Sequence, residues 1–143
     1  MDPEKIFSLA GIIATVGWIV LIFLPFWKKR DQYVLHFIIV LLAILYSWII
    51  ITNFDKSILS NFSTLAGVSE LFSNRTLLLA GWVHYLAFDL LAGIYIIRNA
   101  AKNGIQHWLI APTLLLTFLF GPFGFLLYSV IKWIKTKRML SDF

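Results

Sequence analysis

Four long runs of apolar residues limit the fold of this chain more than any other feature. They lie at roughly residues 6–27, 33–52, 76–97 and 108–131. Each is close to the ~20 residues that a helix needs to cross a bilayer. The runs lack the alternation of polar and apolar residues that marks the strands of a membrane barrel. Because backbone polar groups in lipid must be satisfied internally, each run is predicted to be a helix.

The composition agrees with a membrane protein. Hydrophobic residues make up 60% of the chain and charged residues 13%, whereas soluble domains are roughly 45–50% apolar. In 143 residues, the four runs leave room for little more than short loops. We therefore predict a single all-α domain over residues 1–143, an integral membrane four-helix bundle. The chain has no cysteine, which excludes disulfides, thiolate metal sites and cysteine nucleophiles.

The basic residues gather in three clusters beside the apolar runs. The clusters are Lys28, Lys29 and Arg30; Arg98 and Lys102; and Lys132, Lys135, Lys137 and Arg138. Such clusters are typical of cytoplasmic loops and of contacts to anionic lipids, so we expect no nucleic-acid site. Four straight spans leave the orientation open. Five basic residues would be cytoplasmic with the N-terminus outside, and seven with the N-terminus inside.

The fourth run allows a second interpretation. A re-entrant turn at residues 121–124, GPFG, would bring all three basic clusters to one side of the membrane. Its half-helices would need protein or water around their exposed backbone. We therefore favour four full spans, with the last kinked at Pro112 and Pro122. The polar connection over residues 53–75 cannot span, and we predict a short interfacial helix there.

The start of the chain is a poor signal peptide. It carries two acids, and no small-residue cleavage site follows it. The first helix is therefore expected to remain in the mature protein. The start also lacks the Ser- and Arg-rich, acid-poor character of a transit peptide. This favours a bacterial inner membrane, or a plastid membrane if the source is a plant or an alga.

Ionisable residues inside the third run are the main functional signal. The segment GWVHYLAFDL places His84, Tyr85 and Asp89 within six positions. A helix turns about 100° per residue, so Tyr85 and Asp89 share one face with Gly81. Trp82 flanks that face. A carboxyl group facing lipid would cost roughly 2.5–3.5 kcal/mol, so we predict that this face points into the bundle.

Other polar residues lie on a different face of this run or in the fourth run. His84 lies about 140° around the helix from Asp89, so the two either line one cavity from opposite edges or meet different helices. The fourth run carries a stripe made of Thr113, Thr117, Gly121, Gly124 and Tyr128. We predict that its first four members pack toward Asp89 and Tyr85. We expect its threonine hydroxyls to bond to their own backbone. The expected ligand contacts are Trp82, Thr113, Thr117 and Tyr128.

These residues favour acid/base chemistry in an apolar cavity. An acid in such surroundings is favoured in its neutral form and can donate a proton. The sequence has no HExxH motif, no Gly-rich phosphate loop and no Ser-His-Asp arrangement. We therefore expect no metal and no cofactor. Asp89, His84 and Tyr85 are the catalytic candidates.

Two long motifs resemble a known family. They are AGWVHYLAFDLLAG at 80–93 and HWLIAPTLLLTFLFGPFGFLLY at 107–128, with weaker support from LPFW and GVSELF. They resemble the abscisic-acid-deficient-4-like family, which includes plant neoxanthin synthases and small bacterial relatives. The resemblance implies four spans and an isomerisation that turns an epoxide end ring into an allene without a redox cofactor. Bacterial relatives occur where neoxanthin is not expected, so the resemblance implies the fold and site better than the substrate.

Two functions remain open on the sequence. The first is a membrane enzyme of isoprenoid or carotenoid metabolism, an isomerase of an apolar polyene with Asp89 and His84 as acid and base. The second is a non-catalytic membrane module that binds a carotenoid or lipid, or assists a partner enzyme. Proton transport is disfavoured because no second acid within a span relays from Asp89. The expected partners are a carotenoid-like ligand and membrane lipids, and homo-oligomerisation is left open.

Overall fold

The computed structural model describes residues 2–137, without the side chains of Lys56 and Ser57, and this part of the chain consists of helices joined by short turns, with no strand. The expected all-α fold is confirmed. In chain order the helices are α1 (Pro3–Phe23), α2 (Arg30–Tyr33), the π-helical η1 (Val34–Ile39), α3 (Val40–Thr52), α4 (Lys56–Asn61), α5 (Leu65–Ser73), α6 (Arg75–Lys102), α7 (His107–Phe120) and α8 (Pro122–Thr136).

Three helices in the described chain are long and apolar enough to cross a membrane. They are α1, the continuous helix Arg30–Thr52 and α6, with 21, 23 and 28 residues. Local signals set their ends. The Asp2 side chain accepts a hydrogen bond from the backbone N–H of Glu4 at the start of α1, and Asn74 caps α6 in the same way. These helices confirm the first three predicted spans, each with its ends moved by a few residues.

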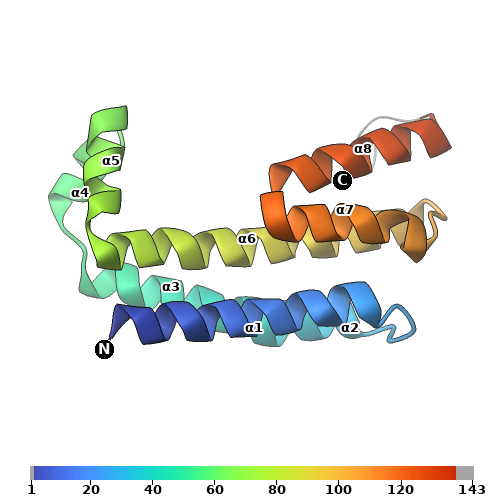
Figure 1. Cartoon of the computed structure of the whole chain (residues 1–143), viewed down its shortest axis with the longest axis horizontal. Coiled ribbons are helices and arrows are strands. Elements are labelled where there is room, and N and C mark those ends of the chain that lie inside the picture. Colours follow the sequence, from blue (N-terminus) through green and yellow to red (C-terminus); the bar gives the residue numbers. More distant parts are fainter. Residues whose placement is uncertain (1, 138–143) are drawn as a thin grey trace.

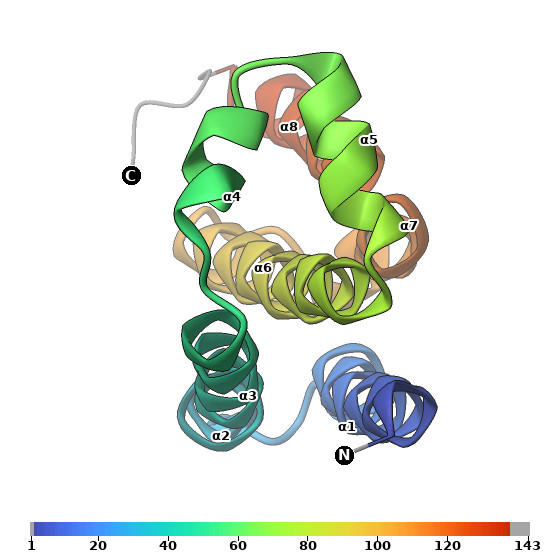
Figure 2. The same ribbon diagram turned by 90° about the vertical axis from the view of Figure 1, so that its left-hand side faces the viewer.

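Helix α6 is the centre of the fold. It contacts α1, α3, α5, α7 and α8, and the view along its axis places α1 and α3 below it and α7 and α8 to the side and above (Figure 2). Small residues allow the close approach. A Cβ added at Gly93 would lie 2.8 Å from the Trp18 ring, so α1 and α6 pack in contact at this level.

The fourth predicted span is wrong. Residues 108–131 form two antiparallel helices, α7 and α8, which lie side by side beyond α6 (Figure 1). With 14 and 15 residues, each helix is about 21–23 Å long, too short for a hydrocarbon core of about 30 Å. The chain turns at Gly121, whose φ of 43° disfavours other residues. Pro122 follows at the first position of α8, where its missing N–H is tolerated.

Close packing holds the two half-helices together. A Cβ at Gly124 of α8 would collide with the backbone of Thr113 and Thr117 in α7. The stripe predicted on one helix is therefore split across two, and Gly124 faces Thr113 and Thr117. Pro112 stands inside α7 without breaking it. Gly121 and Gly124 are buried, so protein surrounds part of the backbone at the turn, as a re-entrant turn requires.

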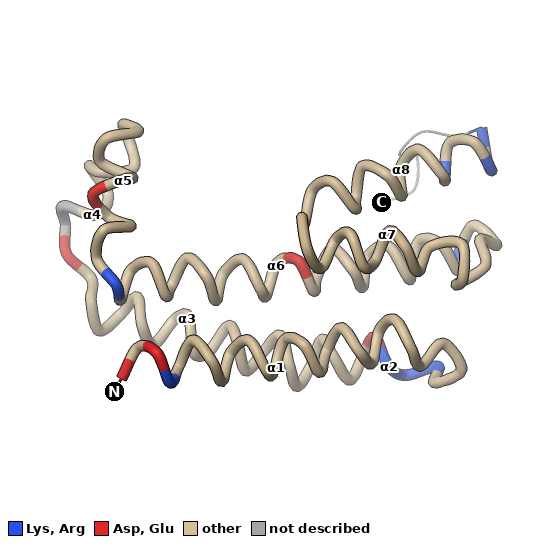
Figure 3. The backbone as a smooth tube through the Cα atoms, in the orientation of Figure 1, with Lys and Arg blue, Asp and Glu red and all other residues tan. Residues whose placement is uncertain are grey.

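The hairpin brings the basic clusters to one end of the molecule (Figure 3). Eight lysines and arginines of the described chain lie at the end where α6 finishes, and three lie at the other end. The eight are Lys28, Lys29, Arg30, Arg98, Lys102, Lys132, Lys135 and Lys137. Basic residues favour the cytoplasmic side. We therefore expect the N-terminus to lie outside, with three spans and a hairpin that enters from the cytoplasm.

Cysteine labelling tests this topology, and the cysteine-free chain is a suitable background. We expect cysteines placed at Lys28, Gln106 and Lys135 to react with a membrane-impermeant maleimide from one side of the membrane. A cysteine at Asn53 should react only from the other side. If position 135 reacts from the same side as position 53, the fourth run crosses the membrane as a straight span.

The connection between the second and third spans contains helices, as predicted. Its second helix, α5, begins where Thr64 accepts a hydrogen bond of 3.0 Å from the Gly67 N–H. Helix α5 runs across the direction of α6 (Figure 1), and its Gly67 and Leu71 are buried. A helix perpendicular to a span lies along the membrane surface, so this segment fits the expected interfacial helix.

Candidate functional site

Asp89 lies in the middle of α6, beside Gly121 in the turn that joins α7 to α8. Only 9% of its surface is exposed, which confirms that it faces the interior. A Cβ added at Gly121 would lie 2.7 Å from Asp89 Oδ1. The absence of a side chain at Gly121 is therefore what lets the tip of the hairpin sit on the carboxyl group.

The hairpin gives Asp89 a specific electrostatic setting. Gly121 precedes the first turn of α8 and offers no side chain to cap it. A helix N-terminus carries a partial positive charge and free N–H groups, so it favours a carboxylate next to it. The apolar surroundings favour the neutral acid instead. Asp89 Oδ2 is buried and has no hydrogen-bond partner among the described residues, so this oxygen is available for a proton.

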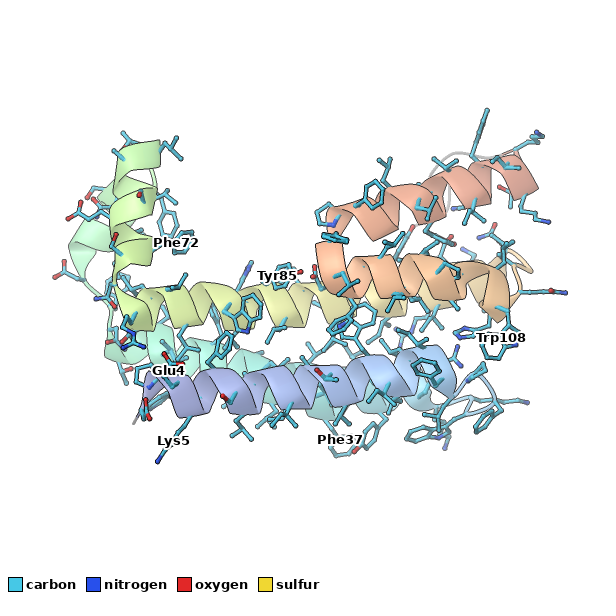
Figure 4. All side chains as sticks on the ribbon, viewed as in Figure 1. Glu4, Lys5, Phe37, Phe72, Tyr85 and Trp108 are labelled. Carbon is cyan, nitrogen blue, oxygen red and sulfur yellow. The ribbon has the colours of Figure 1, made fainter. Side chains whose placement is uncertain are left out.

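Tyr85 stands one helical turn before Asp89 and lies near the middle of α6 (Figure 4). Residues four apart are neighbours on one helix face, so its side chain lies beside that of Asp89. Its hydroxyl donates a long hydrogen bond of 3.4 Å to the Leu119 carbonyl oxygen. The Trp82 ring lies 5.5 Å from the Tyr85 ring, between centroids. The structure thus brings three of the predicted site residues, Asp89, Tyr85 and Trp82, together.

Tyr85 and Trp82 line an apolar groove between α1, α6 and α7. The groove has a volume of about 560 Å³, and Gly11, Phe118 and Leu119 also line it. A second pocket of about 310 Å³ shares Trp82 and Phe7 with it and reaches the Glu4–Arg75 ion pair. The two pockets lie next to each other along α6, with the Phe7 and Trp82 rings, 5.2 Å apart between centroids, bordering both. Small-molecule sites commonly have volumes of this size.

His84 lies on a different face of α6 from Asp89. Its ring stacks on Phe88 with centroids 4.4 Å apart and lies 5.6 Å from the Tyr46 ring of α3. It borders a separate apolar pocket of about 420 Å³, which is also lined by α4 and α5 residues such as Ile58 and Phe72. Of the two arrangements left open by the sequence, the structure places His84 and Asp89 against different neighbours.

The remaining predicted ligand contacts make internal hydrogen bonds. Thr113 donates to the Ile110 carbonyl oxygen at 2.7 Å, and Thr117 donates to that of Thr113 at 2.8 Å. Both threonines are fully buried, as the packing interpretation expects. The Tyr128 hydroxyl donates to Asn99 Oδ1 at 2.6 Å. Tyr128 therefore lies on α8 toward the basic end, away from the groove.

Sequence reasoning missed two features near these residues. The first is the contact between Gly121 and Asp89, whose only signal was the Gly-Pro pair at 121–122. The second is a pair of hydrogen bonds that join α7 to α1 and α2. Arg30 Nη2 donates to His107 Nδ1 at 3.1 Å, and His107 Nε2 donates to the Ile22 carbonyl oxygen at 2.8 Å. Within residues 2–137, no group of three histidine, aspartate or glutamate side chains could hold a metal ion.

These observations define a class: a small all-helical membrane protein in which a helical hairpin meets a buried acid on a central helix. The chain belongs to the ABA DEFICIENT 4-like family, whose model matches residues 5–128. The match covers all three spans and the hairpin as far as Tyr128, and it confirms the resemblance found in the sequence motifs. A comparison with curated proteins and a comparison with solved structures give no match.

Proposed function

We propose that the protein is an acid/base isomerase of an oxygen-bearing apolar isoprenoid of the carotenoid type. One observation carries the proposal. A buried carboxyl group, with one oxygen unpartnered among the described residues, lies behind a tyrosine that lines an apolar groove. The family to which the chain belongs supports a substrate of this type. Opening of an epoxide end ring, as in neoxanthin synthesis, is the model reaction.

The groove suits a long amphiphile that enters from the lipid. Ten residues of α6 separate Arg75 from Tyr85, a distance of about 15 Å along the helix. Glu4 and Arg75 form an ion pair at the surface end and offer hydrogen bonds to a hydroxyl group. The lining between them is mainly apolar, with Phe7 and Trp82 at its centre. A polar end would be held at the surface while an oxygen inside the membrane meets Tyr85.

One carboxyl group can complete the proton balance of an isomerisation. The neutral Asp89 passes a proton through the Tyr85 hydroxyl to the epoxide oxygen, and one C–O bond breaks to leave a hydroxyl group. A proton then leaves the polyene carbon, its C–H electrons form the new C=C bond, and the carboxylate of Asp89 takes up that proton. Atoms and charge balance without a redox step. The helix N-terminus of α8 stabilises the carboxylate that forms in between.

The test compares lipid extracts of carotenoid-producing host strains with and without the protein. We expect a new product with the mass of its precursor and a different retention time, because an isomerisation conserves atoms. Several strains with different oxygenated carotenoids are needed, since the substrate is defined only by class. Extracts that stay identical in all strains would overturn the enzyme proposal.

The runner-up is a non-catalytic module that binds a carotenoid or lipid. The contact between Asp89 and Gly121 favours it, because a carboxylate at the start of α8 also serves to hold the hairpin in place. This function predicts a pigment that purifies with the protein unaltered. It also predicts that Asp89→Asn keeps the bound pigment and the phenotype.

The His84→Gln variant tests whether the pocket beside His84 takes part in the reaction proposed at Asp89 and Tyr85. We expect this variant to retain activity near the wild-type level, because His84 contacts Tyr46 and Phe88 rather than the Asp89 group. Tyr85→Phe is the matched comparison and should lower activity strongly while keeping the ring in place. Both are read in the same extract assay. A loss in His84→Gln equal to that of Tyr85→Phe would show that His84 belongs to the reacting site.

A further inference from the structure

Lys132 is a buried cation that the proposed reaction does not use. It lies on α8, and 3% of its surface is exposed. Its Nζ atom has no hydrogen-bond partner within the described chain. An unpaired ammonium group covered by protein costs free energy unless an anion joins it. Neighbouring lysines behave differently, since Lys135 on the same helix is exposed.

Lys132 lines a small pocket between α6 and α8. The pocket has a volume of about 120 Å³ and is also bordered by Tyr95, Phe125, Tyr128 and Trp133. The Tyr128 hydroxyl already donates its proton to Asn99. Lys132 is the charged side chain among the residues that line this pocket. The space is enough for a group of a few heavy atoms, and the aromatic walls suit the start of an acyl chain.

The position of Lys132 matches the level of lipid phosphates. The turn at Gly121 meets the middle of α6, and Lys132 lies eleven residues further along α8, about 16 Å away. Half of the hydrocarbon core is about 15 Å thick. Trp133 next to it is exposed, as expected of a residue in the interfacial aromatic belt. This end of the molecule carries eight of the basic residues of the described chain (Figure 3). With the expected orientation it meets the cytoplasmic leaflet, where anionic lipids attract basic residues.

We propose that Lys132 and the pocket between α6 and α8 bind the phosphate group of an anionic phospholipid. The phosphate pairs with Nζ, and the first part of an acyl chain lies against Phe125 and Trp133. The bound lipid would contact both α8 and α6 and stabilise their packing at the end opposite the turn. The hairpin tip, and with it the contact to Asp89, would then depend on the lipid composition of the membrane.

Thermal unfolding of the purified protein in zwitterionic detergent tests this proposal. Phosphatidylglycerol, phosphatidylcholine and inorganic phosphate are added separately. We expect Tm to rise with phosphatidylglycerol and not with phosphatidylcholine. Lys132→Met should abolish that rise and should also unfold at a higher temperature than the wild type without lipid, because it removes an unpaired buried charge. Lys135→Met, the exposed control on the same helix, should respond like the wild type.

Each outcome decides the proposal. A rise with inorganic phosphate alone would identify the free anion as a sufficient ligand of the same site. An equal response of Lys132→Met and the wild type would overturn the site, and so would an equal loss in Lys135→Met. If Lys132→Met does not fold, native mass spectrometry of the wild type decides, since the site requires a retained anionic lipid. Wild-type protein that retains none and shows no phosphatidylglycerol response would end the proposal.

Discussion

Asp89→Asn is expected to reduce isomerase activity by about 10²–10⁴-fold, the usual contribution of a general acid or base. The amide has nearly the shape of the carboxyl group, and its oxygen still accepts hydrogen bonds. It therefore fits against Gly121 and still serves the start of α8. It has no acidic proton, so the step to the substrate oxygen is lost. The extract assay measures the change in product.

Stability measurements show whether Asp89→Asn loses activity through its chemistry or through poorer folding. An amide is less costly than a charge in the membrane, so Asp89→Asn should express and unfold like the wild type or at a slightly higher temperature. Glu70→Gln is the matched control, because Glu70 is an exposed acid on α5. It should change neither activity nor stability. An active Asp89→Asn variant would reduce Asp89 to a packing residue and would leave the binding module as the better function.

The three long spans could be predicted because their signal is local. Each run supplies about 20 apolar residues, and in lipid such a run has no alternative to a helix. The ends were misplaced by a few residues because capping residues such as Asp2 and Asn74 lie outside the apolar runs. Polar capping residues extend a helix beyond the hydrophobic pattern.

The hairpin could not be settled from the sequence because it depends on tertiary contacts. A Gly-Pro pair inside an apolar run is compatible with a kink and with a full turn. The choice is made by the packing of Gly124 on α7 and of Gly121 on Asp89. These contacts bury Gly121 and Gly124. No periodicity within residues 108–131 carries that information.

The site was predictable as far as one helix determines it. Asp89 and Tyr85 share a face because they are four residues apart, and the cost of exposing an acid to lipid fixed the direction of that face. The surroundings of His84 depend on which helix fills the other side of α6. That helix is α3, through Tyr46. The angle between His84 and Asp89 around α6 does not tell which neighbouring helix each of them meets. Lys132 was recognised only as part of a basic cluster, because its burial also depends on which helix packs against its own.

Gly124→Ala is expected to destabilise the protein by roughly 1–3 kcal/mol, the usual cost of overpacking a tightly packed site. The added methyl group would collide with the backbone of Thr113 and Thr117. Backbone cannot move aside as a flexible side chain can, so α8 must shift away from α7. In a membrane, close packing of small residues is a main source of helix association. Unfolding by a denaturing detergent measures the loss.

Gly11→Ala provides the control, because a Cβ at Gly11 meets nothing within 4 Å. It should unfold within about 0.5 kcal/mol of the wild type. Gly11 lines the groove, so this control is compared by stability alone. A shifted α8 also moves Gly121, and we therefore expect Gly124→Ala to lose activity even in the fraction that remains folded. Equal stability of the two alanine variants would mean that α7 and α8 do not pack through Gly124, and the hairpin that places Asp89 would lose its main support.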